Sequence, residues 1–323
     1  MRTDLDKRKR ARRKKVLAVI SCLMAVVLVI NGWFIIRTLV GKGGASDSTQ
    51  SQPAERTPLK SIEADVFSDQ MIVMDLTHNK VLFKKAADEK TRPASLAKMM
   101  TALVVIEHTE DFDERLKIPH DIYTYLNGSG IAVAGFEDGE RLTVEDLLYG
   151  MLFNSGAECC LTLARHTAGS EAAFVKMMNE KASELGMKNT TFGNCIGLDN
   201  PACYTTARDW MRLTRYALKN EHFRQIFTSY TYKIKPTNKC DETRTIRNAA
   251  VRRFGNDRAG VFGGKLGNTT QAQLCLASIA KIDGWEYVCI SMHAQRTEEH
   301  YNPHVDDART VYKQIAEKLK EQE

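Results

Sequence analysis

The first forty positions contain one unbroken apolar run, from Val16 to Ile36, without a charged side chain. An α-helix of these 21 residues would be roughly 31 Å long, which matches the hydrocarbon core of a bilayer. Nine Lys and Arg residues lie ahead of the run, within residues 1–15, and few follow it closely. The positive-inside rule therefore predicts a cytoplasmic basic tail over 1–15, a single transmembrane anchor over 16–40, and export of the rest.

Residues 41–61 are rich in Gly, Ser, Thr, Gln and Pro and have almost no large apolar side chains, which is typical of a flexible linker. From Ile62 onward the pattern is globular, so one domain is expected over 62–323. Gly43 and Ala45 are small residues two positions apart, as in a weak signal-peptidase site. Cleavage of the N-terminal segment therefore stands as an alternative to the uncleaved anchor.

Strands are predicted near both ends of this domain, with helices between them. Two β-hairpins are expected, one over 71–83 and one over 273–292. Pro93 followed by Ser95 and an apolar run predicts a helix that starts near Ser95 and extends to residue 106. Further helices are expected over 142–163 and 171–185, with an amphipathic helix over 305–319. Because the strands come from distant segments, they predict an α+β fold with one mixed sheet.

The formal net charge of +6 is distributed unevenly along the chain. Residues 1–15 carry +7, so the other 308 residues sum to −1. A near-neutral domain offers no general basic surface for nucleic acid, and no nucleic-acid partner is expected. With 43% hydrophobic and 27% charged residues, the chain is not intrinsically disordered.

Cysteine and histidine spacing gives little sign of disulfides or metals. Cys22 lies in the predicted span, which leaves an odd number outside it, and no CxxC pair occurs. Cys195 and Cys203 could bridge a short loop, although buried, reduced side chains are the favoured interpretation. His300 and His304 have the i, i+4 spacing of zinc ligands, but Pro303 interrupts the helix they would need. No metal and no cofactor are predicted.

Candidate chemistry begins at Ser95-Leu-Ala-Lys98. Residues i and i+3 share one face of a helix, so the Lys98 amine can reach the Ser95 hydroxyl. A neutral lysine can take the hydroxyl proton and so create a nucleophile. Its pKa must then fall about three units from roughly 10.4, through burial or a nearby cation. The same spacing recurs at Ser278 and Lys281, but on a predicted strand, where i and i+3 point to opposite faces.

Longer stretches make the pattern around Ser95 more specific. They are Met71-Ile-Val-Met-Asp75, Arg92-Pro-Ala-Ser-Leu-Ala-Lys-Met-Met-Thr-Ala-Leu103, Leu142-Thr-Val-Glu-Asp-Leu-Leu-Tyr-Gly-Met-Leu152 and Glu184-Leu-Gly-Met-Lys-Asn-Thr-Thr-Phe192. In this order they resemble the serine D-alanyl-D-alanine carboxypeptidases, the low-molecular-mass penicillin-binding proteins, over about residues 62–300. The resemblance implies a penicillin-binding, β-lactamase-like transpeptidase fold. In this fold an antiparallel sheet is flanked by helices and joined to a mainly helical subdomain, with the site between them.

The resemblance also implies site residues. The family motif S-x-x-K is intact, so Ser95 matches the acylated nucleophile and Lys98 its base. The second motif, S-x-N, stands here as Ser155-Gly-Ala157; the serine can still relay a proton to the leaving amine, but the asparagine amide is absent.

The third motif, K-T-G, stands here as Lys265-Leu266-Gly267. Lys265 is expected to attract the substrate carboxylate and to lower the pKa of Lys98, and Gly267 to let the strand approach the substrate. Leu266 cannot donate a hydrogen bond, and Thr269 or Thr270 could substitute for the lost hydroxyl. The backbone N–H groups of Ser95 and Asn268 match the oxyanion hole.

The resemblance implies a membrane-tethered, extracellular carboxypeptidase that removes the terminal D-Ala from peptidoglycan stem peptides, with β-lactams acylating the same serine. Because Ala157 and Leu266 depart from the motifs, an impaired protein that binds peptidoglycan or a protein partner is the alternative. A β-lactamase is the third hypothesis; its deacylating E-x-x-L-N string is absent.

Overall fold

The structure, a computed structural model, describes residues 57–322. The basic tail and the anchor predicted over 1–40 lie outside these residues, together with most of the linker and Cys22. No helix among the described residues has the length and apolar character needed to cross a membrane. The folded domain begins slightly earlier than the sequence predicts. Leu59, expected in the linker, is buried, and the Ile62 N–H donates to the carbonyl of Leu82.

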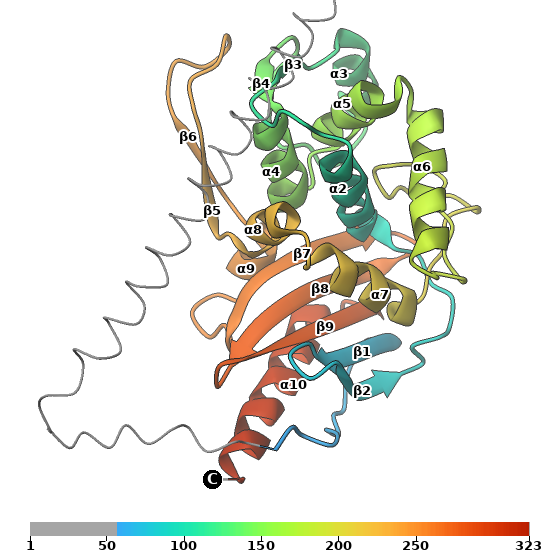
Figure 1. Cartoon of the computed structure of the whole chain (residues 1–323), viewed down its shortest axis with the longest axis vertical. Coiled ribbons are helices and arrows are strands. Elements are labelled where there is room, and N and C mark those ends of the chain that lie inside the picture. The colour runs from blue at the N-terminus through green and yellow to red at the C-terminus, as the bar shows by residue number, and fades with distance from the viewer. Residues whose placement is uncertain (1–56, 323) are drawn as a thin grey trace, which may run out of the picture. The chain divides into compact units, whose positions relative to one another are not determined.

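A five-stranded antiparallel sheet, in the order β2-β1-β9-β8-β7, forms the centre of the domain (Figure 1). Both predicted hairpins are confirmed as β1–β2 and β8–β9. The first strand pairs with the last, so the sheet joins segments more than 200 residues apart, and β7 is an edge strand. The strands are β1 (Gln70–Asp75), β2 (Lys80–Lys85), β7 (Val261–Thr269), β8 (Gln273–Ile282) and β9 (Trp285–Ala294).

Helices cover both faces of this sheet (Figure 1). The C-terminal helix α10 (Pro303–Lys320) packs on β8 and β9, and its predicted apolar positions are all buried. On the opposite face α7 (Ala207–Ala217) contacts β1 and β9, and α8 (Glu221–Thr228) contacts β7. The short helix α9 (Ala249–Arg253) also lies against β7.

The middle of the chain forms a mainly helical subdomain. Its helices are η1 (Ala94–Leu96, a 3-10 turn), α2 (Ala97–Glu107), α3 (His120–Leu126), α4 (Val144–Asn154), α5 (Ala157–Ala168) and α6 (Glu171–Glu184). Two small two-stranded antiparallel sheets accompany them, β3 (Arg115–Lys117) with β4 (Arg141–Thr143), and β5 (Thr231–Ile234) with β6 (Arg244–Arg247). The expected helix over 171–185 is confirmed.

The single helix expected over 142–163 is instead a strand followed by two helices. Residues 141–143 form β4, and the Thr143 hydroxyl and Asp146 carboxylate cap each other's backbone at the start of α4. Ser155 then adopts a left-handed conformation, with φ 60°, and ends α4. Such a conformation cannot continue a right-handed helix, so the second motif stands at a break between α4 and α5.

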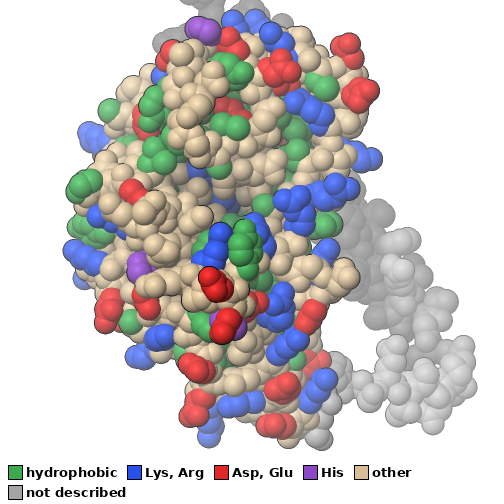
Figure 2. All heavy atoms as spheres, turned by 180° about the vertical axis from the view of Figure 1, so that it is seen from behind, with side chains coloured by type: hydrophobic (Ala, Val, Ile, Leu, Met, Phe, Trp, Pro, Cys, Tyr) green, Lys and Arg blue, Asp and Glu red, His purple; other side chains and the backbone are tan. Residues whose placement is uncertain are grey.

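Figure 2 shows acidic and basic side chains interspersed over one face of the domain, without a broad patch of one sign. This distribution agrees with the near-neutral charge of the sequence after residue 15.

Candidate active site

Ser95 and Lys98 lie where η1 passes into α2, as the Pro93 signal predicts. Ser95 is half-buried in η1, and Lys98 is in the first turn of α2. The Nζ atom of Lys98 lies 3.2 Å from Oγ of Ser95. It also donates to the carbonyl oxygen of Ile196, at 2.5 Å. The lysine is therefore held between the serine and a loop about one hundred residues away in sequence.

The loop at Gly197 fits directly against the turn that carries Ser95. Gly197 has φ +82°, and a Cβ atom built on it would lie 1.9 Å from the carbonyl oxygen of Ala94. Only a residue without a side chain permits this approach. The loop position that places the Ile196 carbonyl on Lys98 therefore depends on a glycine.

Lys98 is buried, with 2% of its surface exposed. Burial lowers the pKa of its amine, while the neighbouring Cys160, Cys195 and Glu158 act weakly in the opposite direction. The direction is the one that a general base needs, because only the neutral amine can accept a proton.

A second lysine–serine pair faces the first. Lys265, from β7, donates through Nζ to the Oγ of Ser155 and to the carbonyl oxygen of Leu266, the latter at 2.7 Å. Lys265 is 1% exposed, and burial together with the charge of Lys98 holds its pKa well below the usual range. The left-handed turn at the end of α4 brings Ser155 to this position.

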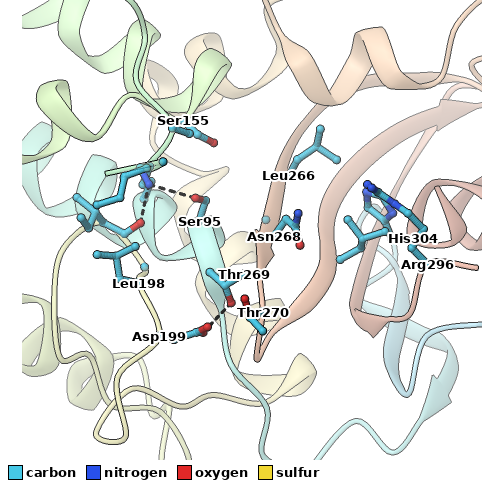
Figure 3. Close-up of a pocket in the computed structure, with 18 of the residues that line it drawn as sticks. Ser95, Ser155, Leu198, Asp199, Leu266, Asn268, Thr269, Thr270, Arg296 and His304 are labelled. Atoms are coloured by element: carbon cyan, nitrogen blue, oxygen red, sulfur yellow. Dashed lines mark hydrogen bonds between the residues drawn. The ribbon is translucent and has the colours of Figure 1, made fainter. Parts of the chain in front are cut away.

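A cleft of about 660 Å³ opens over these groups (Figure 3). Ser95 and Ser155 lie on one side of it, with Leu266 and Asn268 of β7 opposite and Arg296 and His304 beyond them. The loop over 129–132 and the loop over 196–199 line it as well. The site thus lies between the helical subdomain and the edge of the sheet.

In the third motif, the Lys265 amine donates to Ser155, which lines the cleft, while Lys265 itself is not among the lining residues. Gly267 makes its close approach to η1: an added Cβ would meet Ala94 Cβ at 3.1 Å and the Pro93 carbonyl at 3.3 Å. Asn268 is exposed and lines the cleft, as expected.

Thr269 also lines the cleft, but its hydroxyl donates to Asp199 at 2.6 Å. Its proton is therefore engaged by Asp199 in this structure. Thr270 is exposed at the same rim.

Sequence reasoning missed several residues that line the cleft. Two arginines, Arg253 and Arg296, occupy its far end together with Asn302 and His304. His304 is buried with no partner for its Nδ1, and burial and the two arginines lower its pKa to about 3. These residues come from α9, the segment after β9 and the start of α10, so no local spacing marks them as one group.

The second motif's Ala157 is fully buried at the start of α5 and does not line the cleft. Its backbone N–H donates to the carbonyl of Ala132, at 3.0 Å. Next to it, Glu158 accepts from the N–H groups of Ala134 and Gly135, at 2.7 and 3.0 Å. Both residues therefore hold the loop that forms one wall of the cleft.

The second S-x-x-K string behaves as its position on a strand predicts. Ser278 is buried on β8 while Lys281 is exposed, so the second S-x-x-K string forms no pair. The seven described cysteines are free, and all except Cys240 are buried. Within residues 57–322, no group of three or more His, Cys, Asp or Glu side chains is placed to hold a metal ion.

Comparisons with known proteins agree with this geometry. The model of the D-alanyl-D-alanine carboxypeptidase family, peptidase S11, matches residues 54–296. The D-alanyl-D-alanine carboxypeptidase DacF of Bacillus subtilis is 29% identical over 230 residues, which cover 71% of this chain and 58% of DacF. That of Streptomyces sp. strain K15 is 31% identical over 211 residues, which cover 63% of this chain and 72% of the relative.

Solved structures show the same fold. The crystal structure of the Streptomyces K15 DD-transpeptidase matches 80% of this chain and 98% of its own, with a TM-score of 0.69 and 24% identity. The D-alanyl-D-alanine carboxypeptidase from Mycobacterium tuberculosis H37Rv matches 82% and 95%, with a TM-score of 0.67 and 27% identity. The expected transpeptidase fold is confirmed.

Proposed function

Because the chain belongs to the D-alanyl-D-alanine carboxypeptidase family, we propose that it removes the terminal D-alanine from peptidoglycan stem peptides through an acyl-enzyme on Ser95. The observation that carries the proposal is the 3.2 Å contact between Lys98 Nζ and Ser95 Oγ, in a cleft that is open to a peptide end. Burial of Lys98 favours the neutral amine that this chemistry requires.

Acylation begins when Ser95 Oγ attacks the carbonyl of the penultimate D-alanine and its proton passes to Lys98. The N–H groups of Ser95 and Asn268 stabilise the oxyanion. The proton that Lys98 took up is relayed through Ser155, which accepts a hydrogen bond from Lys265, to the amine of the departing D-alanine, so that Lys98 is neutral again. Lys98 then takes a proton from the water that attacks the ester and returns it to Ser95 Oγ as the shortened peptide leaves with its new carboxylate.

The terminal carboxylate of the substrate is assigned to the end of the cleft beyond Leu266. The Lys265 amine donates to Ser155 and the Thr269 hydroxyl to Asp199, whereas Arg296 and Arg253 line this end. A guanidinium pairs with a carboxylate in a bidentate fashion and keeps its charge at every physiological pH. Arg296 is therefore proposed as the main carboxylate-binding group.

The binding-only alternative has less support. Ser95, Lys98, Ser155 and Lys265 are assembled as two interacting pairs, and neither altered residue removes a member of them. Because Ala157 stands where the family has asparagine, one side-chain amide is absent from the site. The loss of one hydrogen bond of this kind costs about 1–3 kcal/mol. A loss of this size slows an enzyme without abolishing turnover.

The test uses a fluorescent penicillin and a D-Ala-D-Ala tripeptide. The purified protein should be labelled on the peptide that contains Ser95, as read by mass spectrometry, and should release D-alanine. A Ser95→Ala variant should do neither, while it unfolds at the same temperature. Absence of both labelling and release from the unchanged protein would establish the binding-only function instead.

For the location, we propose a single-pass membrane protein with a cytoplasmic N-terminus and an extracellular domain. Support comes from the uncharged run from Val16 to Ile36 and the basic residues ahead of it. Protease added to intact protoplasts should digest the domain while the protein remains in the membrane fraction. A domain that resists protease until lysis contradicts this topology, and a domain released into the medium indicates cleavage near Ala45.

A further inference from the structure

A second hollow, of about 450 Å³, lies next to the cleft. It is formed by the start of β1, the segment ahead of η1, the loop around Pro201 and the turn between β7 and β8. The residues that line it are Asp69, Gln70, Lys90, Thr91, Arg92, Pro201, Tyr204, Gln271 and His293. None of them is used in the mechanism above.

Two cations in this hollow lack a carboxylate partner within residues 57–322. Arg92 donates through Nη1 to the carbonyl oxygens of Asn200 and Cys203 and so keeps its charge uncompensated. Lys90 is exposed, with its Nζ 4.0 Å from the centre of the Tyr204 ring. The one acidic side chain among the lining residues, Asp69, is held by His293 Nδ1 at 2.6 Å.

The floor contains a further unused polar group. Gln70 is 8% exposed, and its Oε1 atom has no hydrogen-bond partner. A buried amide oxygen without a partner costs free energy, which a donor such as a peptide N–H or a water recovers. The hollow therefore combines uncompensated positive charge with unfilled hydrogen-bonding capacity.

The hollow continues the cleft past the end of β7. Thr270 lines the cleft and the next residue, Gln271, lines the hollow. Asp199 joins the two, since it accepts from the Thr269 hydroxyl and from the N–H of Gln271, at 2.6 and 3.0 Å. The position of the terminal carboxylate sets the direction of the bound peptide. With that carboxylate at Arg296, at the far end of the cleft, the acyl side of the peptide runs towards Thr270.

We propose that this hollow is an accessory subsite for a carboxylate on the acyl side of the substrate, two to three residues before the penultimate D-alanine. The assignment rests on the proposed function. Asn268 and Gln271 are three positions apart, at most about 11 Å of chain. A peptide extended beside β7 covers that length with the same number of residues, and Lys90 is the exposed cation it then meets.

The test compares three peptides. The first is diacetyl-L-Lys-D-Ala-D-Ala. The second extends it with acetyl-L-Ala and a γ-linked D-Glu whose α-carboxylate is free, and the third carries the carboxamide of that group. In the unchanged protein, kcat/KM should be about twofold to fivefold higher for the carboxylate peptide than for the amide, the effect of one exposed charge pair.

In Lys90→Gln, the ratio of the two kcat/KM values should fall to about one. Lys219→Gln, which replaces an exposed lysine after α7, should leave the ratio unchanged. The proposal is overturned if the unchanged protein treats the carboxylate and amide peptides alike, or if Lys90→Gln leaves their ratio intact. If no peptide is hydrolysed, the proposed function fails separately. The subsite is then judged by calorimetric binding of the same two peptides, with equal affinity counting against it.

Discussion

The amine of Lys98 approaches the hydroxyl of Ser95 to 3.2 Å while both belong to the same short segment of the chain. The amine also donates to the carbonyl of Ile196, and this second hydrogen bond fixes its position. A base held in this way needs no rearrangement to take the serine proton, provided that it is neutral.

The first prediction concerns the pH dependence of acylation. Because burial lowers the pKa of Lys98 below the 10.5 of a free lysine, its neutral fraction grows as the pH rises through that lowered value. The second-order rate of penicillin labelling should therefore rise with pH and then level off. Lys98→Arg, which stays protonated, should label at least about 100-fold more slowly. A flat pH profile, or an active arginine variant, would show that another group is the base.

The second prediction tests the packing of the Gly197 loop on the Ser95 turn. Gly197→Ala forces a Cβ atom against the Ala94 carbonyl and should cost at least about 2 kcal/mol of unfolding free energy. It should also slow labelling of Ser95 at temperatures where the protein is folded. Gly186→Ala is the matched control, since Gly186 has φ +67° but nothing within 4 Å of an added Cβ. Equal effects of the two variants, in urea unfolding and in labelling, would contradict a specific contact.

The third prediction concerns the altered third motif. Leu266→Thr introduces a hydroxyl where the cleft leads to Arg296, and should raise kcat/KM for D-Ala-D-Ala peptides about tenfold through one hydrogen bond to a charged group. Leu266→Val has nearly the same shape without the hydroxyl, so the difference between the two isolates the hydrogen bond. Identical kinetics for the threonine and valine variants would place the carboxylate elsewhere.

The fourth prediction follows from His304. Its pKa is lowered to about 3 by burial and by Arg253 and Arg296, whereas the unfolded chain has the ordinary value of 6.5. Between these values the unfolded state binds more protons, so stability falls as the pH drops from 6.5 towards 3. The slope from this group is about 1.4 kcal/mol per pH unit. In denaturant unfolding between pH 4 and 5.5, the stability of the His304→Gln variant should depend on pH less steeply by about that amount. Parallel stability curves for the two proteins would refute this role of His304.

Local sequence patterns predicted the helices, hairpins and side-chain contacts that form within one short stretch of the chain. The apolar residues that recur every three or four positions from Val305 to Leu319 are buried in α10. The apolar runs on either side of Gly284 form β8 and β9. The serine–lysine pair also belongs to this class, because residues three positions apart on a helix share a face. The break at Ser155 was not predicted, although Asn154-Ser155-Gly156 interrupts the apolar run with residues that favour a turn.

The sequence by itself determined that Ser95 meets Lys98, since that contact depends on residue type and local spacing. Only the tertiary structure decided that Lys265 donates to Ser155, that Ile196 holds Lys98, and that Arg296 lies at the end of the cleft. The first two of these relationships join residues 110 and 98 positions apart. They arise from how the sheet and the helical subdomain pack, and no repeat or spacing along the chain encodes such packing.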